Sequence, residues 1–272
     1  MPNRPSPAHA LALRAWRQLH ADAGQALLLT QRAATRAAAE QDARGAGWAE
    51  LVLGFHRLYF AAPAAAAEQF ERAGRQLAAV QDRAGEILAA TGRARALWRL
   101  GRVGEAMALV LPLRDEGLRL LAPEQRGVLL NAIAGCYSAQ GDSENAFAYM
   151  YQALREASPR RGHGFDTALY CNLSHELIEL GDCDEALRQI ERGLQRLEGL
   201  QNGRLLTVLL VNRTICLSSL GRAREALADL QRFAQARPDP SGRGLLPLHF
   251  EALALAALRA GEPTLAEQLL GR

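Results

Sequence analysis

The side chains that usually carry out enzymatic chemistry are scattered along this sequence. No Gly-x-Ser-x-Gly motif is present, and all 32 basic residues are arginine, so a phosphate-binding loop would lack its lysine. The acidic cluster at residues 182–185 is typical of a helix N-terminus. Four cysteines form no Cys-x-x-Cys pair and have no histidine at metal-ligand spacing: Cys136, Cys171, Cys183 and Cys216. We therefore predict no enzyme active site, no metal and no cofactor.

One group of residues suits binding rather than catalysis. Arg95, Trp98 and Arg99 lie within five residues of one another. Guanidinium groups bind carboxylates through two parallel hydrogen bonds, and tryptophan contributes a large contact area. The group would suit an acidic partner or a C-terminal carboxylate, although Trp98 could equally pack into a neighbouring helix pair. The basic segment 158–164 could contact an anionic partner, but a solvated linker explains it better.

The composition predicts that helices hold these residues. The chain has 272 residues, of which 49% are hydrophobic and only 6% aromatic. Its apolar content is mostly alanine and leucine, which favour helices over strands. The net charge of +3 is small, and although it is unevenly spread, a nucleic-acid binder usually concentrates its positive charge far more sharply. No apolar run approaches the roughly 18 residues of a membrane span, and Arg14 and Arg17 interrupt any signal-peptide core. We expect an all-α cytoplasmic protein.

A forty-residue repeat runs through the chain. Glycine recurs at this spacing in five places: Gly101, Gly141, Gly181, Gly221 and Gly261. An alanine follows each glycine by five residues, and this alanine series extends back to the start of the chain: Ala26, Ala66, Ala106, Ala146, Ala186, Ala226 and Ala266. Alanine replaces the glycine in the first two units, at Ala21 and Ala61. The period predicts seven units, at residues 8–40, 47–80, 84–120, 124–158, 164–198, 203–237 and 244–272.

Each unit is typical of a helical hairpin. In residues 129–159, apolar residues recur at helical spacing on both sides of Gly141. Glycine at this position predicts a left-handed helix stop, and Asp142 or Ser143 can cap the second helix. Ala146 is small because the two helices are expected to cross there at close range, where a larger side chain would overpack.

These residues resemble the tetratricopeptide repeat (TPR) family. Its pattern places bulky, small and tyrosine residues on the first helix and then Gly, Ala, Phe, Ala and a closing Pro, as in LLNAIAGCYSAQGDSENAFAYMYQALREASP. The resemblance implies an α-α superhelix, a single solenoid over residues 1–272 whose first helices line a concave groove. The forty-residue period is similar to the longer repeats of bacterial signalling regulators and kinesin light chains.

The resemblance also implies which side chains face the groove. These positions hold Tyr59, Arg95, Trp98, Arg99, Asn131, Ser138, His175 and Glu179. The lysine and asparagine clamp of chaperone-binding members is missing, because the asparagine slot holds arginine, glycine, histidine and isoleucine in units three to six. Recognition of chaperone tails in that manner is therefore not expected.

Two functions follow as hypotheses. The first is a protein- or peptide-binding module, the N-terminal sensory domain of a longer bacterial cytoplasmic signalling protein such as a GGDEF diguanylate cyclase or a transcriptional regulator. An effector domain would then lie in the same chain, because the sequence stops partway through the second helix of unit seven. The alternative is a free-standing scaffold. Neither predicts direct contact with nucleic acid or membrane, and a homodimer is compatible with both.

Overall fold

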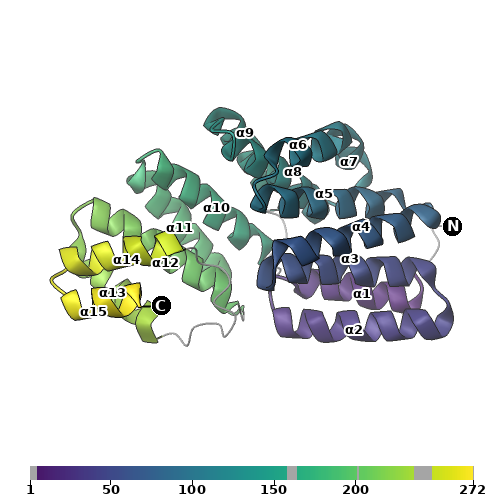
Figure 1. The fold of residues 1–272 in the computed structure, drawn as a ribbon, viewed down its shortest axis with the longest axis horizontal. Coiled ribbons are helices and arrows are strands. Elements are labelled where there is room, and N and C mark those ends of the chain that lie inside the picture. The colour runs from purple at the N-terminus through teal and green to yellow at the C-terminus, as the bar shows by residue number, and fades with distance from the viewer. Residues whose placement is uncertain (1–4, 158–163, 201, 236–246, 272) are drawn as a thin grey trace. The chain divides into compact units, whose positions relative to one another are not determined.

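The computed structural model describes residues 5–157, 164–200, 202–235 and 247–271, and its helices pair into antiparallel hairpins (Figure 1). Among these residues there is no β-strand, which confirms the predicted all-α fold of about seven hairpins. The hairpins are α1 (Pro7–Gln18) with α2 (Ala23–Glu40), α3 (Ala43–Phe60) with α4 (Pro63–Ala79), α5 (Arg83–Arg99) with α6 (Val103–Val110), η1 (Leu111–Leu113) and α7 (Arg114–Leu120), α8 (Pro123–Ser138) with α9 (Ser143–Ala157), α10 (Phe165–Glu179) with α11 (Cys183–Leu197), α12 (Gly203–Ser219) with α13 (Ala223–Gln235), and α14 (Pro247–Arg259) with α15 (Pro263–Leu270).

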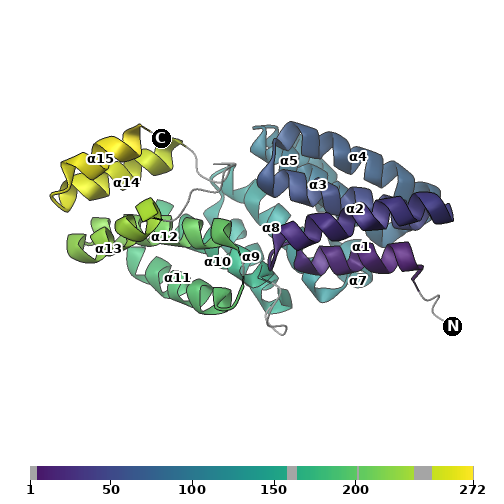
Figure 2. The same cartoon turned by 90° about the horizontal axis from the view of Figure 1, so that it is seen from below.

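The hairpins belong to two compact units. Unit 1 covers Met1–Phe165 and contains α1 to α9, and unit 2 covers Asp166–Arg272 and contains nearly all of α10 and the helices that follow. Within each unit, every hairpin lies beside the next one along the chain (Figures 1 and 2). A single solenoid over residues 1–272 stays a prediction.

The repeated glycines end the first helix of their hairpins. All five have a positive φ, between +73° and +80°, and nothing lies within 4 Å of the place where a Cβ atom would stand. At Gly101 the amide bonds back to Trp98, and the next amide bonds to Leu97, which closes the helix end. The predicted left-handed stop is therefore present in the last five hairpins.

Helix caps also follow the forty-residue register. Asp142 accepts a hydrogen bond from the Asn145 amide at 3.1 Å, so this residue, rather than Ser143, caps α9. First helices carry caps that the sequence analysis missed: Asp42 before α3, Asp82 before α5 and Asn202 before α12. These three caps lie at multiples of 40 residues from one another, so the same periodicity would have revealed them.

The core is built from small residues set against large ones. The seven repeated alanines are at most 2% exposed, as expected for helix crossing points. The ring of Phe70 on α4 covers Gly92 on α5, where an added Cβ would lie 2.3 Å from a ring carbon. Hairpins therefore stack by placing the second helix of one against the first helix of the next.

Candidate functional site: the first-helix face of unit 1

Arg95 forms a bridge between two hairpins. Its Nη1 donates a hydrogen bond to the Tyr59 hydroxyl at 2.7 Å, and its guanidinium carbon lies 5.2 Å from the centre of the Tyr59 ring. The contact therefore combines a hydrogen bond with a cation–π interaction. It joins α5, just before its last turn, to the last turn of α3, so this arginine already has a structural partner.

The other two members of the predicted arginine–tryptophan group also make contacts between hairpins. Arg99 donates a hydrogen bond to the backbone carbonyl of Leu58, and its side chain is exposed. Trp98 is half-buried and covers Gly135 on α8, where an added Cβ would lie 3.3 Å from the indole ring. The packing role left open for Trp98 is therefore present, and carboxylate binding by this group stays a prediction.

The remaining predicted groove residues are divided between the two units. Asn131 is buried on α8 and Ser138 is half-buried near the end of that helix, both in unit 1. His175 and Glu179 are exposed on α10 in unit 2, where the His175 ring lies 6.4 Å from the His249 ring of α14. Within unit 1 the structure brings Tyr59 and Arg95 together directly.

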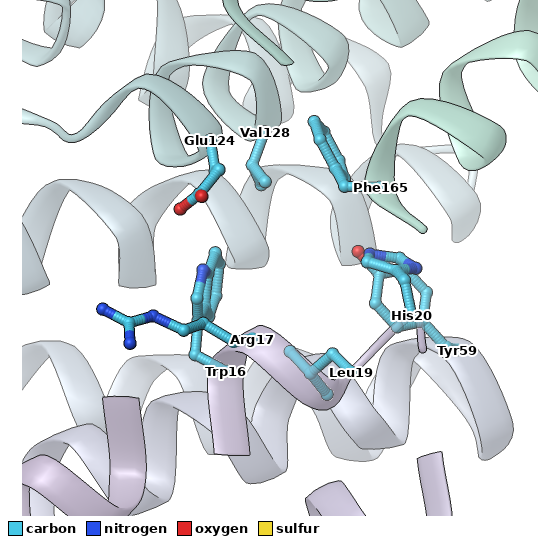
Figure 3. A pocket seen from close by; sticks show the side chains of 8 residues that line it. All are labelled: Trp16, Arg17, Leu19, His20, Tyr59, Glu124, Val128 and Phe165. Carbon is cyan, nitrogen blue, oxygen red and sulfur yellow. The ribbon is translucent and has the colours of Figure 1, made fainter. Parts of the chain in front are cut away.

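A pocket on the same side of unit 1 is the main feature that the sequence analysis did not predict (Figure 3). The space inside it is small, about 30 Å³, and lies within a concavity of about 380 Å³ that includes open solvent. Its walls come from α1 and the turn after it, α3, α8 and the first residue of α10. The lining residues are Trp16, Arg17, Leu19, His20, Tyr59, Glu124, Val128 and Phe165. We call these eight residues the unit-1 pocket.

Aromatic contacts fix the walls of the unit-1 pocket. The His20 ring lies between two others, 4.9 Å from Tyr59 and 5.5 Å from Phe165, measured between ring centres. Trp16 meets Phe55 edge to face at 5.0 Å. Such pairing restricts ring rotation, so the pocket offers a preformed apolar surface rather than one assembled by a ligand.

The rim of the pocket carries one charge of each sign. Arg17 is exposed on α1, and Glu124 is half-buried in the first turn of α8. In Figure 3, Glu124 and Val128 point toward the side chains of the first hairpin, and Trp16 lies beneath the Glu124 carboxylate. The arrangement suits an uncharged group inside the pocket and polar groups of a peptide at its edge.

Among the pocket residues, the sequence analysis proposes only Tyr59 as a binding residue. Trp16 and His20 lie four residues apart, as do Phe55 and Tyr59, so both pairs place rings on one helix side. This concentration of rings in the first two hairpins was a usable signal. The sequence gives no signal that these rings lie near Glu124, because that proximity depends on how four hairpins stack.

The described residues give little support to other kinds of site. No group of three or more histidine, cysteine or acidic residues among them could hold a metal ion. Burial raises the pKa of Cys136 to about 11 and that of Cys171 to about 12, so neither thiol is a ready nucleophile. No helix in the described part of the chain is both long and apolar enough to cross a membrane.

Most of the arginines around a depression between α11 and α12 in unit 2 are paired with nearby carboxylates. Arg213 bonds Glu191 at 2.9 Å and the buried Asp229 at 2.7 Å. Two of the other three arginines around it form ion pairs within their own helix or turn, Arg188 with Glu185 and Arg222 with Glu225, and Arg192 donates a hydrogen bond to Gln189 at 3.3 Å. These arginines therefore stabilise the stack and do not form a convincing anion site.

Comparisons with known proteins address the fold. No family model and no curated protein sequence matches this chain. Among solved structures, BtubC (BKLC) from P. vanneervenii is similar at 17% identity and a TM-score of 0.60, over 76% of this chain and 87% of that one. A Podosopora anserina putative kinesin light chain with nearly identical TPR-like repeats matches at 20% identity and a TM-score of 0.52, over 67% and 90% of the two chains.

A third neighbour covers almost the whole chain. It is a Rap protein complexed with Competence and Sporulation Factor, with 13% identity, a TM-score of 0.61, and coverage of 99% of this chain and 78% of that one. Identities this low relate folds and do not transfer functions. The forty-residue glycines, the stacked hairpins and these neighbours together show that the chain has a TPR-like all-helical repeat fold.

Proposed function

We propose that this protein is a protein- or peptide-binding repeat module whose unit-1 pocket receives a small apolar side chain of its partner. One observation carries the proposal, namely the preformed ring-lined pocket on the first-helix side of unit 1. Pockets of this kind, apolar inside with a few polar groups at the rim, are the usual form of a ligand site. The Rap neighbour, solved with a bound factor, lends support at the level of fold.

The predicted arginines contribute a second part to this proposal. Arg95 bonds Tyr59, and Tyr59 also lines the pocket, so the guanidinium lies next to the pocket wall. Arginine has five N–H donors, of which the Tyr59 hydroxyl uses one. A carboxylate of a bound peptide could engage others, with Arg99 on the following turn. His175 and Glu179 in unit 2 remain proposed contacts for a longer partner.

The wider role also remains a proposal. The forty-residue period supports a sensory domain of a bacterial cytoplasmic signalling protein, with an effector such as a GGDEF diguanylate cyclase elsewhere in the chain. A free-standing scaffold that carries out no catalysis is the alternative. The gene sequence downstream of residue 272 discriminates between them.

Selection from a random peptide display library tests the binding proposal. Selected peptides should share a small apolar anchor, and Trp16→Ala or Val128→Arg should weaken their binding at least about tenfold. Tyr151→Ala is the matched control, because this exposed tyrosine lies on α9 and does not line the pocket. Equal binding by all three variants would remove the pocket from the proposal.

The same peptides separately test whether Arg95 and Arg99 bind a carboxylate of the partner. Arg95→Ala combined with Arg99→Ala should weaken peptides that carry a free carboxylate at the C-terminus, and amidated versions should bind both proteins alike. Circular dichroism checks that the helical signal is intact. If amidation has no effect on the unaltered protein, the arginines act only between hairpins.

A further inference from the structure

Four leucines line an open groove in unit 2, at the connection between α11 and α12. The space inside it is about 500 Å³, within a concavity of about 820 Å³ that includes open solvent. Leu206 is 40% exposed, and Leu194 and Leu200 are half-buried. The side chains that line the groove are Leu194, Leu197, Glu198, Leu200, Asn202 and Leu206. We call these six side chains the leucine groove.

The backbone between the two helices holds the leucine groove in shape. Helix α11 ends at Leu197, and the Leu200 amide donates a hydrogen bond back to the Leu197 carbonyl at 2.9 Å. Gly199 has a φ of +79°, which allows the chain to turn there. Asn202 is buried and accepts a hydrogen bond from the Leu205 amide at 3.1 Å, which caps α12. The groove is therefore formed before any partner binds.

The forty-residue register shows that Leu206 takes a position that charged residues hold in earlier hairpins. Its equivalents form ion pairs in three of them: Glu86 with Arg83 at 2.9 Å, Arg126 with Glu156 at 3.6 Å, and Asp166 with Arg196 at 3.4 Å. A leucine at this position forms no such pair. A single exposed leucine is ordinary on a protein surface, but here it lies beside Leu194 and Leu200 in one groove. The three together make an apolar surface that is open to solvent.

The charge at this groove is negative. Glu198 is exposed and forms no ion pair with any described residue. It directly follows the last residue of α11, where the helix dipole favours a cation. The residues at this register position in the first three hairpins are uncharged: Ala38, Ala78 and Leu118. Arg196 on α11 bonds the buried Asp166 and does not line the groove. A basic residue of a partner would therefore be stabilised at this end of α11.

The size and openness of the groove favour a protein segment over a small molecule. Its 500 Å³ lies within the usual range of ligand sites, about 300–1,000 Å³. Small-molecule sites bury roughly 70–90% of their ligand, whereas much of this concavity faces solvent. An amphipathic segment can place its apolar side chains on the leucines and keep its polar side in water.

We propose that the leucine groove binds a basic amphipathic segment of a partner protein. Two large apolar side chains of this segment contact Leu200 and Leu206, and an arginine or lysine lies beside Glu198 at the end of α11. The groove lies within unit 2 and shares no residue with the unit-1 pocket. It is a second binding site, and neither proposal depends on the other.

A labelled synthetic peptide of sequence LRRLLRRL, blocked at both ends, is a suitable probe, because as a helix it has leucines on one side and arginines on the other. Fluorescence anisotropy with the complete gene product should give saturable binding. Leu200→Glu combined with Leu206→Glu should weaken this binding at least about tenfold, since buried apolar contacts dominate such docking. Glu198→Arg should weaken it about threefold or more, and most strongly at low salt.

Position provides the controls. Leu180→Glu combined with Leu220→Glu should leave binding unchanged, because these leucines are 59% and 39% exposed in unit 2 but lie outside the groove. Val128→Arg should also leave it unchanged, because Val128 lines the unit-1 pocket. This variant separates the two proposals, since a peptide bound in the unit-1 pocket would lose affinity. Circular dichroism confirms that each variant is folded.

Three results with the peptide would overturn the proposal. The first is no saturable binding at millimolar peptide, and the second is equal binding to the Leu200→Glu, Leu206→Glu variant. The third is equal affinity for LRRLLRRL and for its acidic counterpart LEELLEEL, which would remove the basic partner.

Two further results would assign the groove to another occupant. Self-association in analytical ultracentrifugation that the Leu200→Glu, Leu206→Glu variant abolishes would assign it to a second copy of this chain. Tighter peptide binding after Leu245→Glu combined with Leu246→Glu would assign it to residues 236–246, which lie outside the described part of the chain. Either result would overturn the proposal of a separate partner.

Discussion

Phe70 and Gly92 fit together so closely that a single methyl group would disturb them. A Cβ atom on Gly92 would lie 2.3 to 2.6 Å from three carbons of the Phe70 ring. Phe70 is only 1% exposed and also covers Gly54 on its own hairpin partner, so the ring has little room to move. The contact sets how closely the second hairpin approaches the third.

Gly92→Ala should therefore destabilise the protein by about 1–3 kcal/mol through overpacking. Gly74→Ala on α4 is the matched control, because its added Cβ would meet Ala89 at an ordinary 3.6 Å. Alanine also favours helix over glycine, so the control should be neutral or stabilising. Urea unfolding followed by circular dichroism measures both. Equal stability of the two variants would contradict the observed packing.

Ala146→Leu should have a similar cost, because Ala146 is fully buried where α8 and α9 cross. The expected loss is about 1–3 kcal/mol in the free energy of unfolding. Ala148→Leu adds the same atoms two residues along α9 at an exposed position and should change stability little. A melting temperature that falls equally in both would show that leucine itself, not its position, is responsible.

Stability should fall as the pH drops from 7 to 5. Burial lowers the pKa of His9 from its ordinary value of 6.5; the carboxylate of Asp82 opposes this effect and the guanidinium of Arg44 adds to it. Burial also lowers the pKa of His56. Because the unfolded chain binds protons at these histidines at higher pH than the folded chain, acidification below about 6.5 favours unfolding.

His9→Gln combined with His56→Gln should flatten this pH dependence over the same range. His175→Gln is the control, because His175 is exposed on α10. Urea unfolding at several pH values gives, for each protein, the slope of the free energy of unfolding against pH. Measurements stay above pH 5, since the pKa of Asp42 is also lowered and affects stability in more acidic solution. An unchanged slope in the double variant would place the effect on other groups.

All four thiols should be protected in the folded protein. Each cysteine is buried, and burial raises the pKa of Cys136, Cys171 and Cys216. Thiolate is the reactive form, so a disulfide reagent at pH 8 should modify the native protein slowly and unfolded protein rapidly at four sites. Rapid modification of one native thiol would reveal local opening around that residue.

The periodic residues carried most of the fold information. Gly141 and Ala146 act locally, through backbone conformation and side-chain size, so their spacing predicted hairpins that the structure contains. The unit-1 pocket could not be predicted from the spacing of such residues. Trp16 and Glu124 line the same pocket only because four hairpins stack closely, through contacts such as that of Phe70 with Gly92. Arg95 could be placed on its helix, but its bond to Tyr59 depends on the same stacking.

The sequence separation between residues in contact affects how the chain folds during synthesis. Bonds between hairpins join near neighbours, such as Arg95 with Tyr59 and Asn212 with Ser174, 36 and 38 residues apart. Each hairpin can therefore settle soon after the next one leaves the ribosome, without waiting for distant sequence. The ring contact of His20 with Phe165 is different, because it joins the first hairpin to the start of the fifth. We expect the stack to form progressively and the pocket wall to be completed only when Phe165 arrives.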